Sequence, residues 1–206
     1  MGFYDDHIVP HLIDLSMRHS ELLPYRKRLL SGGRGRVLEI GVGSGLNLPH
    51  YPARAREIVG LEPSARLVAM AQRRAQLCTV PVSLITGSAE AIPADAHSFD
   101  TVITAWTLCS IGDAIRALRE VRRVLKPEGQ LLFVEHGLAP DGKVQRWQHR
   151  LTPLWKKFGG GCHLNRPICA LIESAGFEIA SLETGYANGA KALAFFYEGS
   201  ARPISG

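Results

Sequence analysis

The sequence predicts an α/β fold with a mostly parallel sheet, and three observations support this prediction. Short, almost continuous apolar runs alternate along the 206 residues with stretches of helical periodicity. The first apolar run leads into a cluster of glycines, and the second run ends in an acidic residue. Continuous apolar strands are typical of a sheet covered on both faces, and their alternation with helices indicates βαβ units. We therefore expect a Rossmann-like three-layer sandwich around a seven-stranded sheet.

Seven apolar runs are the candidate strands of this sheet. In chain order they are residues 37–40, 57–62, 82–86, 100–105, 130–135, 177–182 and 191–197. Helix-like stretches separate the first five runs, which predicts that these strands pair in parallel. The last two runs lie close together in the sequence, so we expect them to form an antiparallel hairpin at the edge of the sheet.

Helical periodicity fills the gaps between these runs. Ser64 and Asp113 are suited to cap helices, because their side-chain oxygens can accept backbone N–H groups of the first turn. The helix after Asp113 is expected to stop at Pro127, since proline cannot continue a helix. A further helix is expected over residues 163–175, where Gly176 ends it.

One globular domain accounts for the whole chain. Its 46% hydrophobic and 21% charged residues are ordinary for a folded protein and exclude a disordered or fibrous one. The net charge is only +5 and the basic residues are scattered, which argues against a nucleic-acid partner. Four cysteines without C-x-x-C spacing indicate reduced thiols in a cytoplasmic protein. No apolar run is long enough to span a membrane, and the histidines lack the spacing of metal ligands.

A glycine-rich turn follows the first apolar run. Gly41, Gly43 and Gly45 allow the backbone to pass close to a bound ligand. The dinucleotide fingerprint G-x-G-x-x-G/A requires a small residue at the position of Leu46, so an NAD-type pyrophosphate is disfavoured. Glu62 ends the second run, where a carboxylate can accept both hydroxyls of a ribose. The pattern therefore predicts a ribose-containing cofactor that lacks a pyrophosphate.

Five segments stand out as a set of motifs. They are VLEIGVGSG (37–45), GLEPS (60–64), GSAEAIP (87–93), SFDTV (98–102) and EVRRVLKPEGQ (120–130). Together they resemble the motifs of class I S-adenosylmethionine-dependent methyltransferases of the type 11 group. The resemblance covers roughly residues 36–198 and implies S-adenosyl-L-methionine as the cofactor. Two positions depart from the pattern. Ser88 stands where an aspartate often reaches the adenine, and Glu128 replaces the first glycine of a P-G-G turn.

This resemblance also implies which residues hold the cofactor. Glu62 would bind the ribose hydroxyls, Pro63 would pack near the adenine, and the backbone N–H of Ala89 would bind the adenine. Thr104 and Ala105, at the end of the fourth run, would face the methionine end. The full set of implied cofactor-binding residues is Glu39, Gly41, Gly43, Gly45, Asn47, Glu62, Pro63, Ser88, Ala89, Glu90, Thr104 and Ala105.

Four segments with different expected roles make up the domain. Residues 36–135 form the cofactor-binding core, and residues 166–206 supply a helix and the hairpin. Residues 1–35 are expected to form a helical lid. Residues 136–165 are expected to be an acceptor-side insertion, because they exceed a normal crossover and are rich in aromatic side chains. An amphipathic helix packed on the sheet is an equally open interpretation of residues 147–155.

Three shorter segments carry a narrower resemblance. TLCSI (107–111), FVEH (133–136) and WKKFGGGCHLNR (155–166) are similar to blocks of the mammalian methyltransferase-like 7 proteins, a family of alkyl thiol S-methyltransferases. This similarity favours a small thiol as the methyl acceptor. Carbon or oxygen methylation of a quinone-like or phenolic molecule is the alternative, and a non-catalytic cofactor-binding protein is a third hypothesis. That family's hydrophobic N-terminal anchor has no counterpart here, so we expect no stable membrane insertion.

The methyl acceptor has to bind outside the carboxyl ends of the strands. Tyr4 in the N-terminal segment, and Trp106 and Cys109 after the fourth run, are therefore the expected substrate contacts. A thiol acceptor must also lose its proton, and histidine is the commonest general base near neutral pH. His136 and His163 are the candidates for that catalytic role.

Overall fold

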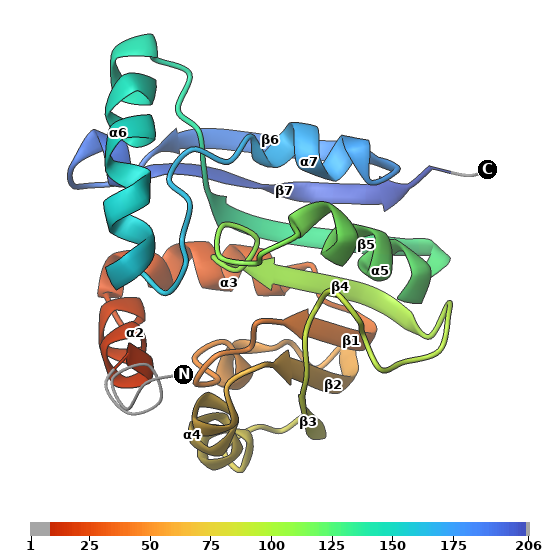
Figure 1. The fold of residues 1–206 in the computed structure, drawn as a ribbon. Helices are drawn as coiled ribbons and strands as arrows, with labels where there is room; N and C mark the ends of the chain where they lie inside the picture. Colours follow the sequence, from red (N-terminus) through yellow and green to blue (C-terminus); the bar gives the residue numbers. More distant parts are fainter. Residues whose placement is uncertain (1–8, 205–206) are drawn as a thin grey trace.

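A seven-stranded sheet forms the middle layer of the computed structural model, which describes residues 9–204 (Figure 1). The strand order is β3-β2-β1-β4-β5-β7-β6. Strands β1 to β5 pair in parallel, whereas β7 is antiparallel to both β5 and β6. This topology confirms the predicted α/β sandwich and its C-terminal hairpin. The strands are β1 (Gly35–Ile40), β2 (Ala55–Glu62), β3 (Val82–Thr86), β4 (Phe99–Ala105), β5 (Leu125–His136), β6 (Phe177–Tyr186) and β7 (Phe195–Pro203).

Helices cover both faces of the sheet, and each face has its own apolar core (Figure 1). Side chains alternate across a strand, so Leu38 and Ile40 of β1 join the core under α5 and α7. Val37 joins the opposite core, under α3 and α4. The helices are α2 (Val9–Met17), α3 (Leu23–Ser31), α4 (Ala65–Ala75), α5 (Ala114–Val124), α6 (Gly142–Phe158) and α7 (Ile168–Ser174).

Several element boundaries differ from the sequence-based expectation. Helix α5 ends at Val124, before Pro127, and β5 begins at Leu125, well before the run expected from residue 130. The helix expected over 163–175 begins only at Ile168, because Pro167 at its N-cap disfavours helical geometry in the residue before it. The last strand was expected over 191–197, but Lys191–Leu193 form a 3-10 turn and β7 begins at Phe195. Polar and small residues make up most of β7 beyond Tyr197, which is why apolar periodicity did not reveal its full length.

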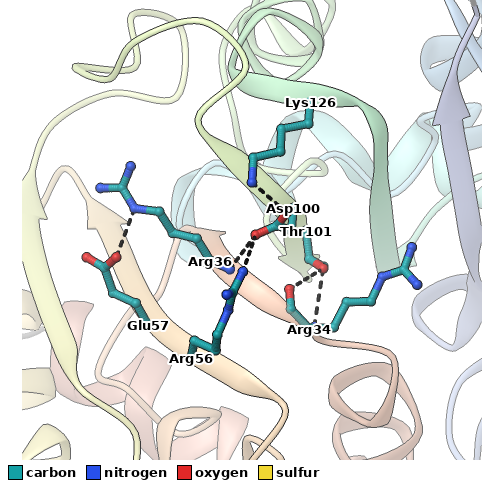
Figure 2. Close-up of polar contacts among 7 residues, drawn as sticks. All are labelled: Arg34, Arg36, Arg56, Glu57, Asp100, Thr101 and Lys126. Atoms are coloured by element: carbon teal, nitrogen blue, oxygen red, sulfur yellow. Dashed lines mark hydrogen bonds and ion pairs between the residues drawn. The ribbon is translucent and has the colours of Figure 1, made fainter.

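A polar network joins β1 and β4 at their amino ends (Figure 2). The Asp100 carboxylate accepts the backbone N–H of Arg36 at 2.7 Å and the Lys126 ammonium at 2.7 Å. The Thr101 hydroxyl accepts the backbone N–H of Arg34 at 3.3 Å and donates to its carbonyl at 3.0 Å. Because these contacts fix the register of β1 against β4, they also fix how the two strands end at the opposite edge.

Helices α2 and α6 lie at that opposite edge, where the parallel strands terminate (Figure 1). Among residues 9–204, no helix combines the length and the apolar character needed to cross a membrane.

Candidate active site

A cavity of about 900 Å³ lies at the carboxyl ends of β1, β2, β4 and β5. This edge of an open α/β sheet is where ligands are expected to bind. The volume is near the upper end of the usual range for small-molecule sites, which gives room for a cofactor and a small acceptor. The strand order determines which segments follow one another along the cavity. The segment after β3 comes first, and the ends of β2, β1, β4 and β5 follow in that order.

The glycine turn after β1 brings the chain back against β2 and β4. The backbone N–H groups of Gly41 and Val42 donate to the Leu61 carbonyl at 2.8 and 3.2 Å. Gly41 has a positive φ of 67°, and a Cβ at this position would collide with the Thr107 side chain. Glycine is thus required for the close approach of the turn to the loop after β4.

Gly45 is not among the residues that line the cavity. A Cβ there would lie 3.0 Å from the Cα of Ala71, so Gly45 instead allows helix α4 to pack closely on the turn. Gly41 and Gly43 do line the cavity, together with Glu39, Asn47, Pro63 and Ala105, as the sequence led us to expect.

Glu62 is held between the glycine turn and the start of α4. Its carboxylate accepts the backbone N–H of Gly43 at 3.1 Å and that of Ser64 at 3.0 Å. The side chain is buried at the cavity wall, and this burial raises the pKa of the carboxyl. Each carboxylate oxygen has two acceptor positions, so both oxygens can still accept a ribose hydroxyl.

The segment after β3 lines the end of the cavity beyond Glu62. Ser88, Ala89 and Glu90 all contribute to this wall. The Ser88 hydroxyl accepts the backbone N–H of Glu90 at 3.1 Å, and the Glu90 carboxylate accepts that of Asp113 at 2.8 Å. The Glu90 side chain is therefore engaged in tying this segment to the start of α5.

A buried charged network lies at the end of β1. Glu39 accepts hydrogen bonds from the Asn47 amide and the Tyr51 hydroxyl, both at 2.7 Å. Burial raises the pKa of Glu39 to about 7. The Asn47 amide oxygen in turn accepts from Arg26, whose guanidinium also donates to the Met17 carbonyl at 2.9 Å.

Sequence reasoning missed Arg26. Among the described residues that line the cavity, it is the one lysine or arginine. The run Arg26-Lys27-Arg28 reads as a solvated helix face, yet the Arg26 side chain is buried against the Trp106 ring, 4.9 Å from its centroid. A carboxyl and a guanidinium thus stand together at the methionine end of the expected cofactor site.

Helix α2 forms a wall of the cavity near the glycine turn. Leu12, Leu15 and Met17 of α2 line it. Buried Asp14 accepts a hydrogen bond from the Ser44 hydroxyl and pairs with Arg74 at 3.0 Å. Helix α2 is thereby attached to the turn that would hold the cofactor. Tyr4, the expected substrate contact from this segment, lies outside the described residues.

The far end of the cavity is here called the acceptor chamber. It is formed by the loop after β4, the end of β5, the end of α6 with the turn that follows it, and β7. Its lining includes Trp106, Cys109, His136, Trp155, Cys162 and Phe196. Trp106 has a φ of 52°, which is uncommon for a residue other than glycine. This turn places the indole between Arg26 and Phe196, whose ring centroid is 5.9 Å away.

A buried carboxyl supports the loop that carries Trp106 and Cys109. Glu135 accepts the backbone N–H of Thr107 at 3.0 Å, and the backbone N–H groups of Leu108 and Cys109 lie close to it. Burial nevertheless raises the pKa of Glu135 to about 7. Thr104, expected to face the cofactor, does not line the cavity: it is fully buried within the sheet and contacts Glu135.

The two candidate histidines occupy different places. His136 lines the acceptor chamber and is 5% exposed, and its Nε2 atom has no hydrogen-bond partner among residues 9–204. His163 does not line the cavity, because its ring turns to the Cys109 carbonyl, 3.1 Å from Nδ1. The structure therefore brings only one of these two imidazoles to the chamber.

Comparison with known proteins defines the class. Residues 38–133 match the family model described as a methyltransferase domain. The solved structure of a putative methyltransferase from Bacillus halodurans C-125 shares the fold, with a TM-score of 0.71 and 16% identity over 87% of this chain and 99% of that one. These similarities support a class I S-adenosylmethionine-dependent methyltransferase, as the motifs predict.

Two curated relatives add detail. Rat thiol S-methyltransferase TMT1B is 36% identical over 153 residues, which cover 71% of this chain and 62% of that protein. The demethylmenaquinone methyltransferase of Thermotoga maritima is 32% identical over 148 residues, 66% of this chain and 61% of that protein. The chain thus spans less than two thirds of the length of each relative.

The family's cofactor is S-adenosyl-L-methionine, and the cavity fits it. Glu62 offers a buried carboxylate with spare acceptor positions for the ribose hydroxyls. Arg26 offers a positive charge to the carboxylate of a zwitterionic methionine end, and the Glu39 carboxyl lies beside it as a hydrogen-bond acceptor.

Proposed function

We propose that this methyltransferase transfers the methyl group to a small thiol. The supporting observation is the composition of the acceptor chamber, where aromatic and sulfur-bearing side chains surround the buried imidazole of His136. The similarity to a relative named as a thiol S-methyltransferase supports the same acceptor. The neighbouring Trp106 Nε1 atom is also buried without a partner among residues 9–204, which leaves a donor for the acceptor molecule.

In this proposal the protein residues position, ionise and enclose the reactants. Glu62 binds the ribose hydroxyls, Ala89 offers its backbone N–H to the adenine, and Arg26 binds the methionine carboxylate. The bound cofactor supplies an activated methyl group on its sulfonium. Holding a nucleophile in line with such a group can contribute about 7–11 kcal/mol to the barrier reduction.

His136 Nε2 takes the proton of the thiol. An alkyl thiol with a pKa near 8.5 is only a few per cent thiolate at neutral pH, so a neighbouring base increases the reactive fraction. Trp106, Trp155 and Phe196 exclude water around the sulfur, because their rings wall the chamber.

A product assay tests the proposal. The purified chain is incubated with S-adenosylmethionine and, in separate reactions, an alkyl thiol, a phenol, a quinol and a primary amine. S-adenosylhomocysteine and the methylated product are measured by mass spectrometry. We expect a thioether product. Turnover of the phenol or quinol, with none of the thiol, would refute the thiol acceptor and leave the methyltransferase class intact.

Carbon or oxygen methylation of a quinone-like ring is the second candidate. The similarity to a protein named as a demethylmenaquinone methyltransferase favours it. The same assay separates the two, since a ring-methylated product and a thioether differ in mass and fragmentation.

We further propose a cytoplasmic location and no nucleic-acid partner. All four cysteines are unpaired, which suits a reducing compartment. The basic residues take part in scattered ion pairs, such as Arg28 with Glu198 and Lys126 with Asp100, instead of forming one stripe. Cell fractionation tests the first statement and a gel-shift assay with transfer RNA the second.

A further inference from the structure

Two cysteines from distant parts of the chain meet in the acceptor chamber. Cys109 lies on the loop after β4, and Cys162 lies on the turn after α6; both line the cavity. The Cys109 thiol donates to the Trp106 carbonyl at 3.6 Å, and the two thiols are close enough to shift each other's pKa. The backbone N–H of His163 donates to the Cys109 carbonyl at 2.8 Å, so the two segments are fixed side by side.

The two sulfurs have different surroundings. The Sγ atom of Cys162 lies 4.0 Å from Nδ1 of His136. The neighbouring Cys109 thiol, with His136 and Trp155, lowers the pKa of Cys162. The Cys162 neighbour and burial raise the pKa of Cys109. Cys162 is therefore the sulfur of the pair that loses its proton more readily.

Cys162 can be reached from the cavity, whereas the Cys109 side chain beside it is buried. Leu15 and Trp155 are 68% and 38% exposed and line the same cavity, so the cavity opens to solvent. Cys162 follows Gly160 and Gly161, which have positive φ values of 60° and 84°. A glycine-rich turn of this kind allows the small backbone shift that a disulfide requires.

We propose that Cys162 and Cys109 form a thiol–disulfide exchange site for small disulfides. The Cys162 thiolate attacks one sulfur of a disulfide RS–SR, the S–S bond breaks, and RS⁻ leaves, which gives a mixed disulfide on Cys162. The departing RS⁻ takes the Cys109 proton. The Cys109 thiolate then attacks the Cys162 sulfur, forms the Cys109–Cys162 disulfide and releases the second RS⁻, which takes a proton from water. The small disulfide is reduced to two thiols and the cysteine pair is oxidised, so no other reactant is needed.

The consequence is a second chemistry in the same chamber. The reaction releases thiols, which are the class of acceptor proposed for methylation, beside the methyl donor's site. An external dithiol such as dithiothreitol returns the pair to its reduced form by the reverse exchange. The exchange itself uses no methyl donor, so its test is independent of the proposed methyl transfer.

The experiment uses reduced protein, without S-adenosylmethionine, and bis(2-hydroxyethyl) disulfide as the probe. Released thiol is quantified, and the protein is analysed by intact mass and peptide mapping. Wild type should release about two equivalents of thiol per chain and gain a disulfide between the two cysteines. Cys109→Ser should release about one equivalent and retain one half of the probe on Cys162. Cys162→Ser should release none.

Cys78→Ser and Cys169→Ser are the matched controls, because neither residue lines the cavity and both variants should behave as wild type. Circular dichroism of each variant verifies that it is folded, and Cys162→Ala repeats the key test with a second side chain. The proposal is wrong if folded wild type releases no thiol, if Cys162→Ser and Cys162→Ala still release it, or if the new disulfide involves another cysteine.

Discussion

The backbone N–H of Gly43 donates a hydrogen bond of 3.1 Å to the carboxylate of Glu62. This contact links the turn after β1 to the end of β2, so the carboxylate is oriented before any ligand binds. Glu62→Gln replaces one acceptor oxygen with an NH₂ group, which then faces backbone N–H groups. The variant also loses the hydrogen bonds of a charged carboxylate, which are worth about 1.5–3 kcal/mol each. We expect S-adenosylmethionine to bind about 10- to 100-fold more weakly, measured by isothermal titration calorimetry.

Glu57→Gln is the control for that substitution. Glu57 lies on the same strand but pairs with Arg36 at 2.9 Å at the far end of the sheet (Figure 2). The affinity of the Glu57→Gln variant for S-adenosylmethionine should match that of the wild-type protein. Equal affinities of Glu62→Gln and Glu57→Gln for the cofactor would show that Glu62 does not bind the ribose.

Arg26 is expected to bind the carboxylate of the cofactor's methionine end. Arg26→Met should weaken S-adenosylmethionine binding about 10- to 100-fold, since a buried charge-assisted pair is lost. Methylthioadenosine lacks the amino-acid portion and should bind the variant and wild type equally. Arg28→Met removes an exposed arginine paired with Glu198 and should leave both affinities unchanged. Parallel losses for both ligands would mean that Arg26 acts only through the fold.

Arg26 also shows where sequence reasoning stops. The strands, the glycine turn and Glu62 follow from local patterns, because hydrophobic periodicity and glycine spacing are properties of short segments. Whether Arg26 or Arg28 is buried depends on how α3 packs against β5 and β7, and neighbouring residues do not encode that choice. The contact between Cys109 and Cys162 is likewise created by the packing of two distant loops, although the sequence placed both residues near a pocket.

The same limit explains His163 and Thr104. Both lie next to segments that reach the cavity, so sequence position made them candidates. His163 instead turns to the Cys109 carbonyl. Thr104 is buried on the other face of the strand from Ala105, because successive residues of a strand face opposite sides. Ala105, one residue further, lines the cavity.

Stability should depend on pH through Glu135. In the folded chain burial raises its pKa to about 7, against 4.5 for the unfolded chain. Between these values unfolding releases a proton, so the free energy of unfolding falls as the pH rises from about 4.5 to about 7. At about 1.4 kcal/mol per pKa unit the effect is roughly 3 kcal/mol, and Glu135→Gln should remove it. Urea unfolding at several pH values measures the difference between the two proteins.

Glu57→Gln serves as the control here as well, since its side chain is partly exposed and ion-paired. It should keep the wild-type slope with pH. The pKa of Glu39 is raised in the same way, but Glu39 is present in every variant. Its contribution to the change of the free energy of unfolding with pH therefore cancels in the comparison. A Glu135→Gln curve parallel to wild type across this range would contradict the prediction.

His136 should matter only for acceptors that need to lose a proton. His136→Gln should lower kcat/KM for an alkyl thiol about 100- to 1000-fold, the lower part of the range for general-base catalysis. An aromatic thiol that is already ionised at neutral pH should be methylated by the variant at close to the wild-type rate. His163→Gln should change neither rate, because His163 lies outside the cavity. Equal losses with both thiols would assign His136 a structural role.

Gly41 should tolerate no side chain. A Cβ there would collide with Thr107, and the φ of 67° is unfavourable for alanine. We expect Gly41→Ala to lower the free energy of unfolding by about 1–3 kcal/mol and to weaken cofactor binding, because the turn must move away from β4. Gly142→Ala, at the start of α6, meets nothing within 4 Å and should be neutral or slightly stabilising. Denaturant unfolding and calorimetric titration of both variants measure these effects, and a Gly41→Ala variant that matches Gly142→Ala in both would show that the turn has space for a methyl group.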